Sequence, residues 1–151
     1  MSEKNPIAVF VTHLFSSHPD YHRVFEYLES ASNFFYRNCS NPEDMPTTGG
    51  QEAIKEKLLE QIRAAEVIVV VSSMFSENQS LITYQMDAAQ ASQLPIVALE
   101  PFGGMGKMPA EVRARAGEVV GWNDRMIVDA IRRQARHEET SRWDVIEFDM
   151  S

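Results

Sequence analysis

A single glutamine, Gln85, is the most informative of the residues that could contact a ligand. It lies in the stretch LITYQMDAAQ (residues 81–90), and if that stretch is a helix, apolar residues surround it. An amide beside an apolar face needs a hydrogen-bond partner, because burying it unpaired costs about 1–3 kcal/mol. Two interpretations are therefore open: Gln85 bonds to neighbouring backbone, or it binds a ligand.

The elements that must position Gln85 alternate along the chain. Short apolar runs predict strands at residues 7–11, 34–36, 67–71, 96–99 and 119–120. Helical periodicity predicts helices at residues 20–31, 51–65 and 81–90, and after Pro109 and Asn123. This pattern predicts an α/β fold of the flavodoxin-like, three-layer type, with a five-stranded parallel sheet in the order 2-1-3-4-5 and helices on both faces.

Ligands of such sheets bind in the crevice between the first and third strands, where the chain reverses direction. The loop after the first predicted strand carries His13 and Phe15, and the loop after the third carries Ser73 and Phe75. Gln85 lies in the first part of the helix that follows this second loop. We therefore expect these side chains to meet at one edge of the sheet.

Composition excludes several classes of function. The 151 residues carry a formal net charge of -8, which argues against a nucleic-acid partner. One cysteine, Cys39, and four scattered histidines give neither a disulfide framework nor the spacing of metal ligands. No segment approaches the roughly 20 apolar residues of a membrane span, and the first apolar run is too short for a signal peptide. We expect a cytoplasmic, metal-free protein.

Other users of this fold are tested by their chemistry. A phosphorylation receiver needs a carboxylate at the end of the third strand, where this sequence has Ser72 and Ser73. A flavin site needs glycine in the first loop, and the segment LFSSHPD (residues 14–20) has none. His13 has no Ser or Cys nucleophile partner in the linear pattern, which argues against a hydrolase triad.

Five short motifs then point to a family. They are VFVTH (residues 9–13), YRNCS (36–40), PIV (95–97), PFG (101–103) and VGWN (120–123). In this order and spacing they resemble the prokaryotic TIR-like family, which includes the short TIR proteins of Thoeris anti-phage defence. The resemblance implies a TIR-like domain over residues 1–136. Residues 137–151 follow as an acidic and aromatic extension, either an edge strand, a self-association segment or a disordered end.

The resemblance also implies a chemistry. Active members of the family are similar to enzymes that break the bond between nicotinamide and ribose in NAD+. They release ADP-ribose or a cyclic or conjugated relative, which a separate effector protein reads as a signal. NAD+ is then the substrate, and no cofactor is expected. The key glutamate of the family falls on Gln85, with Ala89 at the small position that follows and Leu81 where many relatives have tryptophan.

The glutamine at this position changes the expected activity. Cleaving the ribosyl bond builds positive charge on the sugar, and a carboxylate stabilises that charge. Losing the carboxylate removes on the order of 4 kcal/mol of attraction, or about three decades in rate. We therefore predict that the chain binds NAD+ but turns it over poorly, and that Gln85→Glu creates or restores activity. A knockout, a natural pseudoenzyme and a shifted register that makes Glu77 the carboxylate all remain open.

The remaining site residues follow from this hypothesis. We expect five residues to line the nucleotide crevice: His13, Phe15, Asn38, Ser73 and Phe75. The two phenylalanines would stack on base or nicotinamide, and core packing is their alternative role. The rival function is a non-catalytic TIR adaptor or nucleotide-binding assembly module, in which the loop at residues 41–50 and the acidic end form a homo-oligomer or bind a partner.

Overall fold

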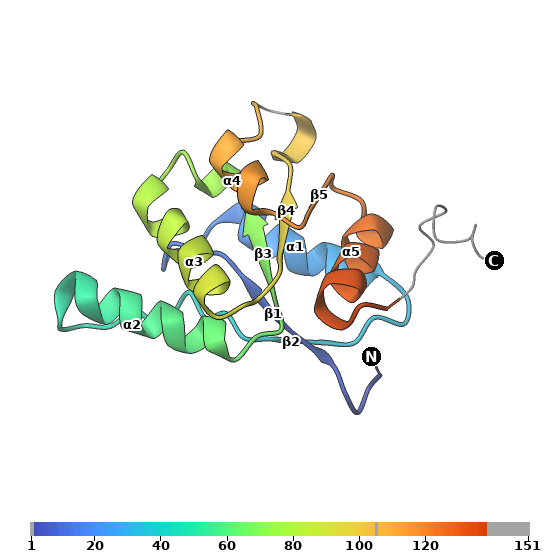
Figure 1. Ribbon diagram of the computed structural model, residues 1–151, viewed down its shortest axis with the longest axis horizontal. Helices are drawn as coiled ribbons and strands as arrows, with labels where there is room; N and C mark the ends of the chain where they lie inside the picture. The colour runs from blue at the N-terminus through green and yellow to red at the C-terminus, as the bar shows by residue number, and fades with distance from the viewer. Residues whose placement is uncertain (1, 105, 139–151) are drawn as a thin grey trace.

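The computed structural model describes residues 2–104 and 106–138 (Figure 1). Its strands are β1 (Ile7–Val11), β2 (Tyr36–Asn38), β3 (Val67–Val71), β4 (Ile96–Leu99) and β5 (Glu118–Val120). Its helices are α1 (Pro19–Ser30), α2 (Gly50–Arg63), α3 (Gln79–Ala91), α4 (Ala110–Arg115) and α5 (Asp124–Arg136). Two short 3-10 turns follow β3 and β4: η1 (Ser72–Met74) and η2 (Phe102–Gly104).

The five strands form one parallel sheet in the order β2-β1-β3-β4-β5, which confirms the predicted topology. In β1, Val9 pairs with Asn38 on one side and Val67 on the other. Helices α1 and α5 pack together, and α2 packs with α3, so both faces of the sheet are covered (Figure 1). All strands therefore end at one common edge, where the loops that precede α1 and α3 meet.

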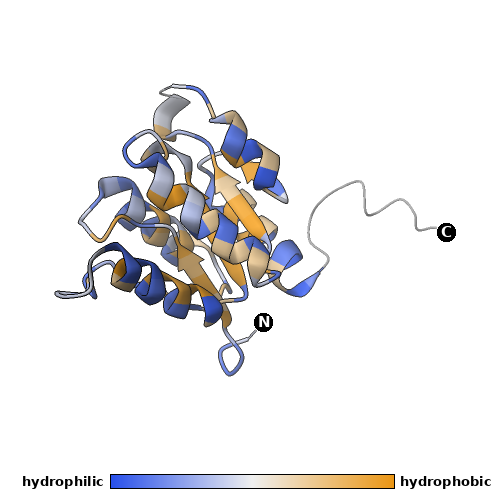
Figure 2. Ribbon diagram, turned by 60° about the vertical axis from the view of Figure 1, so that its left-hand side comes forward, coloured by the Kyte–Doolittle hydropathy of each residue, from blue (hydrophilic) through white to orange (hydrophobic). Residues whose placement is uncertain are grey.

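The core lies where both faces of the sheet are covered. Every residue of β1 (IAVFV) and of β3 (VIVVV) is buried. These central strands show as continuous hydrophobic ribbons between helices of mixed character in Figure 2. A strand that is buried on both faces reads as an unbroken apolar run, which is why the sequence located these two strands correctly.

The predicted position of the second strand, residues 34–36, is wrong by two residues. The first residue pair between β1 and β2 is Ile7 with Tyr36. Ile7 N also donates to the carbonyl of Phe35, just before the strand (3.0 Å). Phe34 is buried in the core just before the strand. The strand itself lies at the sheet edge, where Tyr36 is half-buried and the polar residues Arg37 and Asn38 are exposed, and the apolar run therefore marked the core contact and not the strand.

The C-terminal part of the chain falls mostly outside this description. The extension expected at residues 137–151 lies beyond the described residues from position 139 onward. Among the described helices, none is both long enough and apolar enough to cross a membrane.

Candidate functional site

Gln85 joins α3 to the end of β1. Its side chain is fully buried, and its Oε1 accepts a hydrogen bond from His13 N (3.1 Å). Its Nε2 donates to His13 O (2.8 Å) and to Leu81 O, one turn earlier in α3 (3.2 Å). Both the oxygen and the nitrogen of the amide therefore have hydrogen-bond partners, and so do the backbone N–H and carbonyl of His13.

This arrangement suits an amide better than a carboxylate. The strand β1 ends at Val11, so His13 N and O have no partner in the sheet ladder and need one elsewhere. A glutamine both accepts and donates, whereas an ionised glutamate only accepts. A carboxylate in the same pose would set one oxygen against the carbonyl oxygens of His13 and Leu81.

The imidazole of His13 is buried beside this contact. Its Nδ1 accepts a hydrogen bond from Phe15 N (3.2 Å), so the ring proton belongs on Nε2, which bonds to Gln61 Oε1 (2.9 Å). Burial lowers the pKa of His13 below its ordinary value of 6.5, and the hydrogen bond to Gln61 opposes this only in part. The ring is therefore neutral at physiological pH.

A cleft of about 770 Å³ opens above these buried groups, between α2 and α3. The described residues that line it come from the β1–α1 loop, the loop before α2, and the facing sides of the two helices. They are Leu14, Phe15, Met45, Gln51, Ile54, Lys55, Asn78, Gln79, Ser80, Leu81, Thr83, Tyr84 and Asp87. The loop before α2 contributes Met45, which is half exposed.

The cleft combines rings, a cation and a helix N-terminus. Phe15 and Tyr84 supply aromatic faces, and the Lys55 ammonium lies 5.5 Å from the Tyr84 ring centroid. Tyr84 Oη also donates to Lys55 O (3.1 Å), which ties α3 to α2. Asn78 caps α3, and the first turn of that helix holds no acidic residue. Lys55 and the helix N-terminus therefore both favour an anionic group.

The carboxylate on the cleft wall belongs to Asp87, which forms an ion pair with Arg115 of α4. Glu77, the alternative acid considered from the sequence, bonds instead to His18 Nε2 (2.7 Å). Both acids therefore have cationic or imidazole partners, and neither points freely into the cleft. No metal-binding group of three or more His, Cys, Asp or Glu side chains occurs within the described parts of the chain.

Of the five residues expected to line the crevice, the structure places Phe15 on the cleft wall. His13 lies beneath it in the core. Phe75 is only 5% exposed and packs in the core, the alternative role considered for it. Ser73 Oγ donates to Asp20 Oδ2 (2.6 Å), and Asn38 Oδ1 accepts from Ser40 N (2.9 Å), both outside the cleft lining.

The sequence interpretation missed Lys55 and Tyr84. Both lie on helices that the sequence predicts, and neither was proposed as a site residue. The signal that could have found them is their position: Lys55 follows the apolar Ile54, and Tyr84 precedes Gln85. Adjacent helical positions differ by about 100°, which places such neighbours at the margin of the buried face.

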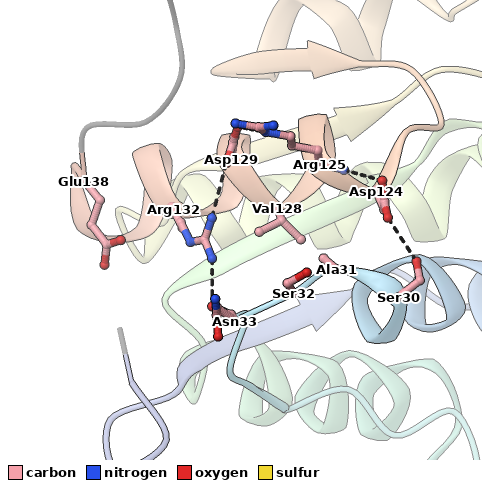
Figure 3. A pocket seen from close by; sticks show the side chains of 10 residues that line it. All are labelled: Ser30, Ala31, Ser32, Asn33, Asp124, Arg125, Val128, Asp129, Arg132 and Glu138. Carbon is pink, nitrogen blue, oxygen red and sulfur yellow. Dashed lines mark hydrogen bonds and ion pairs between the residues drawn. The ribbon is translucent and has the colours of Figure 1, made fainter.

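A second hollow, of about 640 Å³, lies between the end of α1 and α5 (Figure 3). Its side chains bond to one another: Arg132 donates to Asp129 Oδ1 (3.2 Å) and to Asn33 O (2.8 Å). Ser30 Oγ donates to Asp124 Oδ2 (3.3 Å). Among the described residues that line this hollow there is no aromatic ring for stacking a base. The α2–α3 cleft is therefore the better candidate for a nucleotide.

The fold and the cleft define a TIR-like domain of the flavodoxin-like α/β class. The family described as Thoeris protein ThsB, TIR-like domain, matches residues 10–103, which is more than half of the chain. The chain belongs to this family of TIR domains of anti-phage defence. The matched segment runs from β1 to η2 and contains Gln85, His13 and every described residue of the cleft. No curated protein matches the sequence.

Proposed function

We propose that this TIR-like domain binds NAD+ in the α2–α3 cleft and cleaves it inefficiently. The observation that carries the proposal is a cleft with aromatic rings and a lysine above a buried amide, Gln85, which stands where the family resemblance expects a glutamate. Rings, a lysine and a helix N-terminus surround the cleft, while Gln85 below it bonds to backbone. NAD+ is the substrate of the family that the chain resembles.

The cleft matches the parts of NAD+ by chemistry. Phe15 and Tyr84 offer faces on which adenine or nicotinamide can stack. Lys55 and the N-terminal turn of α3 offer positive charge for the pyrophosphate. The volume of about 770 Å³ lies within the usual range for small-molecule sites. These features support binding without requiring a catalytic carboxylate.

The same features support weak cleavage. An oxocarbenium-like ribose needs a nearby negative charge, and an amide supplies none. Gln85 is also held away from the cleft by three hydrogen bonds to backbone. Asp87, on the cleft wall, is already neutralised by Arg115. Each observation lowers the expected rate of nicotinamide release.

A second candidate function rests on the family and on the position of Gln85. A carboxylate there would make the domain an NAD+ glycohydrolase or cyclase. Its ADP-ribose-derived product would signal to a separate effector protein in anti-phage defence. Gln85→Glu tests this candidate, and we expect it to raise cleavage while lowering stability, because the new side chain cannot donate to His13 O.

Titration with NAD+ tests the proposed binding. Phe15→Ala is expected to weaken affinity by about tenfold, since losing an aromatic stack removes roughly 1 kcal/mol or more. Phe102→Ala is the matched control, because Phe102 is half-buried outside the cleft lining. Lys55→Met should weaken binding and flatten its salt dependence, whereas Lys57→Met, which removes pairs with Asp44 and Glu60, should not.

Two outcomes would contradict the proposal. NAD+ affinity that is indifferent to Phe15→Ala would show that the α2–α3 cleft is not the site. Failure of the folded protein to bind NAD+ at all would remove the nucleotide and leave the adaptor hypothesis, which sedimentation of the free protein would then test.

A further inference from the structure

Four residues form a continuous chain of hydrogen bonds beneath the cleft, called here the polar relay: Gln85, His13 and Gln61, which are buried, and Asn41, which is exposed. Gln85 holds the backbone of His13. The His13 ring bonds through Nε2 to Gln61 Oε1 (2.9 Å). The same Oε1 accepts from Asn41 N (3.0 Å), and Gln61 Nε2 donates to Asn41 O (3.2 Å). The relay thus runs from α3 through the end of β1 to α2 and the loop that precedes α2.

Every bond in the polar relay has one allowed direction. Phe15 N donates to His13 Nδ1, so the ring proton must lie on Nε2 and donate to Gln61. Gln61 must then turn its oxygen toward the ring, which leaves its amide group to donate to Asn41 O. Gln85, His13 and Gln61 are at most 8% exposed, so water cannot readily replace a lost partner. Only a neutral imidazole fits this arrangement.

Two contacts of the polar relay hold two walls of the cleft: His13 holds Phe15, and Gln61 holds Asn41. Phe15 has a φ of 55°, in the left-handed region that a residue with a side chain adopts only with support. Its amide bonds to the imidazole, and its ring packs edge-on against that imidazole with centroids 4.7 Å apart. At the second contact, Asn41 begins the segment that carries Met45 to the cleft.

We propose that His13 is a positioning residue whose neutral imidazole holds Phe15 and, through Gln61, the segment at residues 41–49 in the conformation that shapes the cleft. The predicted effect on NAD+ affinity rests on the proposed function. The predicted effect on the Phe15 and Asn41 amides does not. His13 itself does not touch the nucleotide.

Protonation would disrupt the polar relay, because none of the ring's contacts within residues 2–104 and 106–138 supplies a balancing charge. The ring packs against Phe10 of β1, Phe15 of the following loop and Tyr21 of α1, and it bonds to Gln61 of α2. Tyr21 is the titratable group among these contacts, and its hydroxyl bonds to Ser40. A proton added at Nδ1 would face the N–H of Phe15. Acid should therefore release the Phe15 wall first.

Two matched variants separate the two contacts of the His13 ring, with Phe15 and with Gln61. In His13→Asn, the side-chain oxygen can take the place of Nδ1 and keep the bond to Phe15 N while losing Gln61. In His13→Gln, the side-chain amide can take the place of Nε2 and keep the bond to Gln61 while losing Phe15. Neither variant titrates, so each also removes the response to acid.

Hydrogen exchange of the nucleotide-free proteins is the primary test. His13→Asn should speed exchange of the Asn41 amide by about tenfold and leave Phe15 protected, and His13→Gln should do the reverse. Wild-type exchange rates at both amides in both variants would overturn the proposal. If either variant fails to fold, the imidazole ¹⁵N shifts of the wild-type protein decide. The Nε2–H tautomer supports the proposal, and an imidazolium at neutral pH overturns it.

NAD+ titration across pH is the second test. Wild-type affinity should fall once the pH drops below the pKa of folded His13, which burial holds under its ordinary value of 6.5, while both variants should bind about tenfold more weakly at neutral pH and show no such fall. A role in stability alone would lower affinity equally at every pH, and an acid response retained in the variants would overturn the assignment to His13. Absence of NAD+ binding at every pH would defeat the proposed function, while hydrogen exchange would still decide the relay.

Discussion

The two ends of the sheet are closed by different chemistry. At the C-terminal edge of the strands, the polar relay uses neutral amides and a neutral imidazole that are almost completely buried. At the N-terminal edge, Glu66 and Arg136 form an ion-pair clamp: Arg136 Nε lies 2.5 Å from Glu66 Oε1, and Arg136 Nη2 lies 2.9 Å from Oε2. Their side chains keep 34% and 20% exposure.

Both groups of side chains bond to backbone at the ends of the strands, but they differ in their exposure to solvent. The ion-pair clamp ties the end of α5 to the start of β1, since Glu66 Oε2 accepts from Ala8 N (3.1 Å) and Arg136 donates to Pro6 O (3.1 Å). The desolvation penalty of these charges is small because solvent still reaches them. Beneath the cleft solvent is excluded, and neutral groups that both donate and accept complete the backbone. The buried layer beneath the candidate site is therefore the part that tolerates charge least.

The largest effect on stability is expected from Gln85→Leu. The substitution keeps the approximate size of the side chain but leaves His13 N and O buried without partners, so the free energy of unfolding should fall by about 3 kcal/mol. Gln90→Leu on the same helix is the control, because Gln90 is exposed, and it should change stability by less than about 0.5 kcal/mol. Urea denaturation measures both. Equal losses in the two variants would remove the structural role assigned to Gln85.

A smaller effect is expected from Arg136→Gln at the opposite end. Breaking the bidentate pair should cost about 1–2 kcal/mol, less than a buried pair would, because both side chains are partly exposed. Arg125→Gln provides the control on the same helix, since Arg125 is 76% exposed and its ion pair with Asp129 is long, at 3.9 Å. Added salt should weaken the wild-type clamp and leave the Gln85 contribution unchanged. Salt sensitivity at Gln85 would contradict the contrast between the two ends.

The smallest expected effect is on the pH dependence of stability, and it distinguishes the two ends most sharply. Acid should remove the contribution of one end before that of the other. The pKa of His13 is lowered by burial, so the unfolded state takes up a proton more readily and stability should fall as the pH drops below 6.5. The pKa of the Glu66 carboxyl is lowered by the Arg136 hydrogen bond, so its contribution is present above 4.5 and is lost only at lower pH.

Denaturation of the wild-type protein over a series of pH values should therefore show two separate losses. His13→Asn should abolish the loss that begins below 6.5, and Arg136→Gln should reduce the later one. A single transition, unaffected by His13→Asn, would mean that the imidazole is not held neutral in the folded protein.

Sequence patterns located the central strands because burial on both faces leaves a signal within each strand's own residues. The unbroken apolar runs of β1 and β3 follow from burial on both faces, and the strand order follows from the short alternating elements. The edge strand β2 was misplaced because an edge strand needs no apolar run. The two phenylalanines before it serve the core and the start of pairing instead.

The site was predictable only to the level of the sheet edge. Parallel topology brings the loops after β1 and β3 together, but it does not say which side chain points up to the cleft and which points down. Phe15 points to the cleft and His13 to the core, two residues apart in one loop. Lys55 and Tyr84 come from helix faces, and only the packing of α2 against α3 brings them together.

The measurement that tests the central claim most directly is NAD+ binding with product analysis, comparing the wild-type chain with Gln85→Glu. We predict that both proteins bind NAD+, that the wild-type leaves it almost intact, and that the glutamate form, though less stable, releases nicotinamide faster. Efficient cleavage by the wild-type protein, lost in Phe15→Ala, would contradict the claim that the amide at position 85 limits the reaction. A folded Gln85→Glu protein that binds NAD+ and leaves it intact would contradict the assignment of position 85 as the acid position.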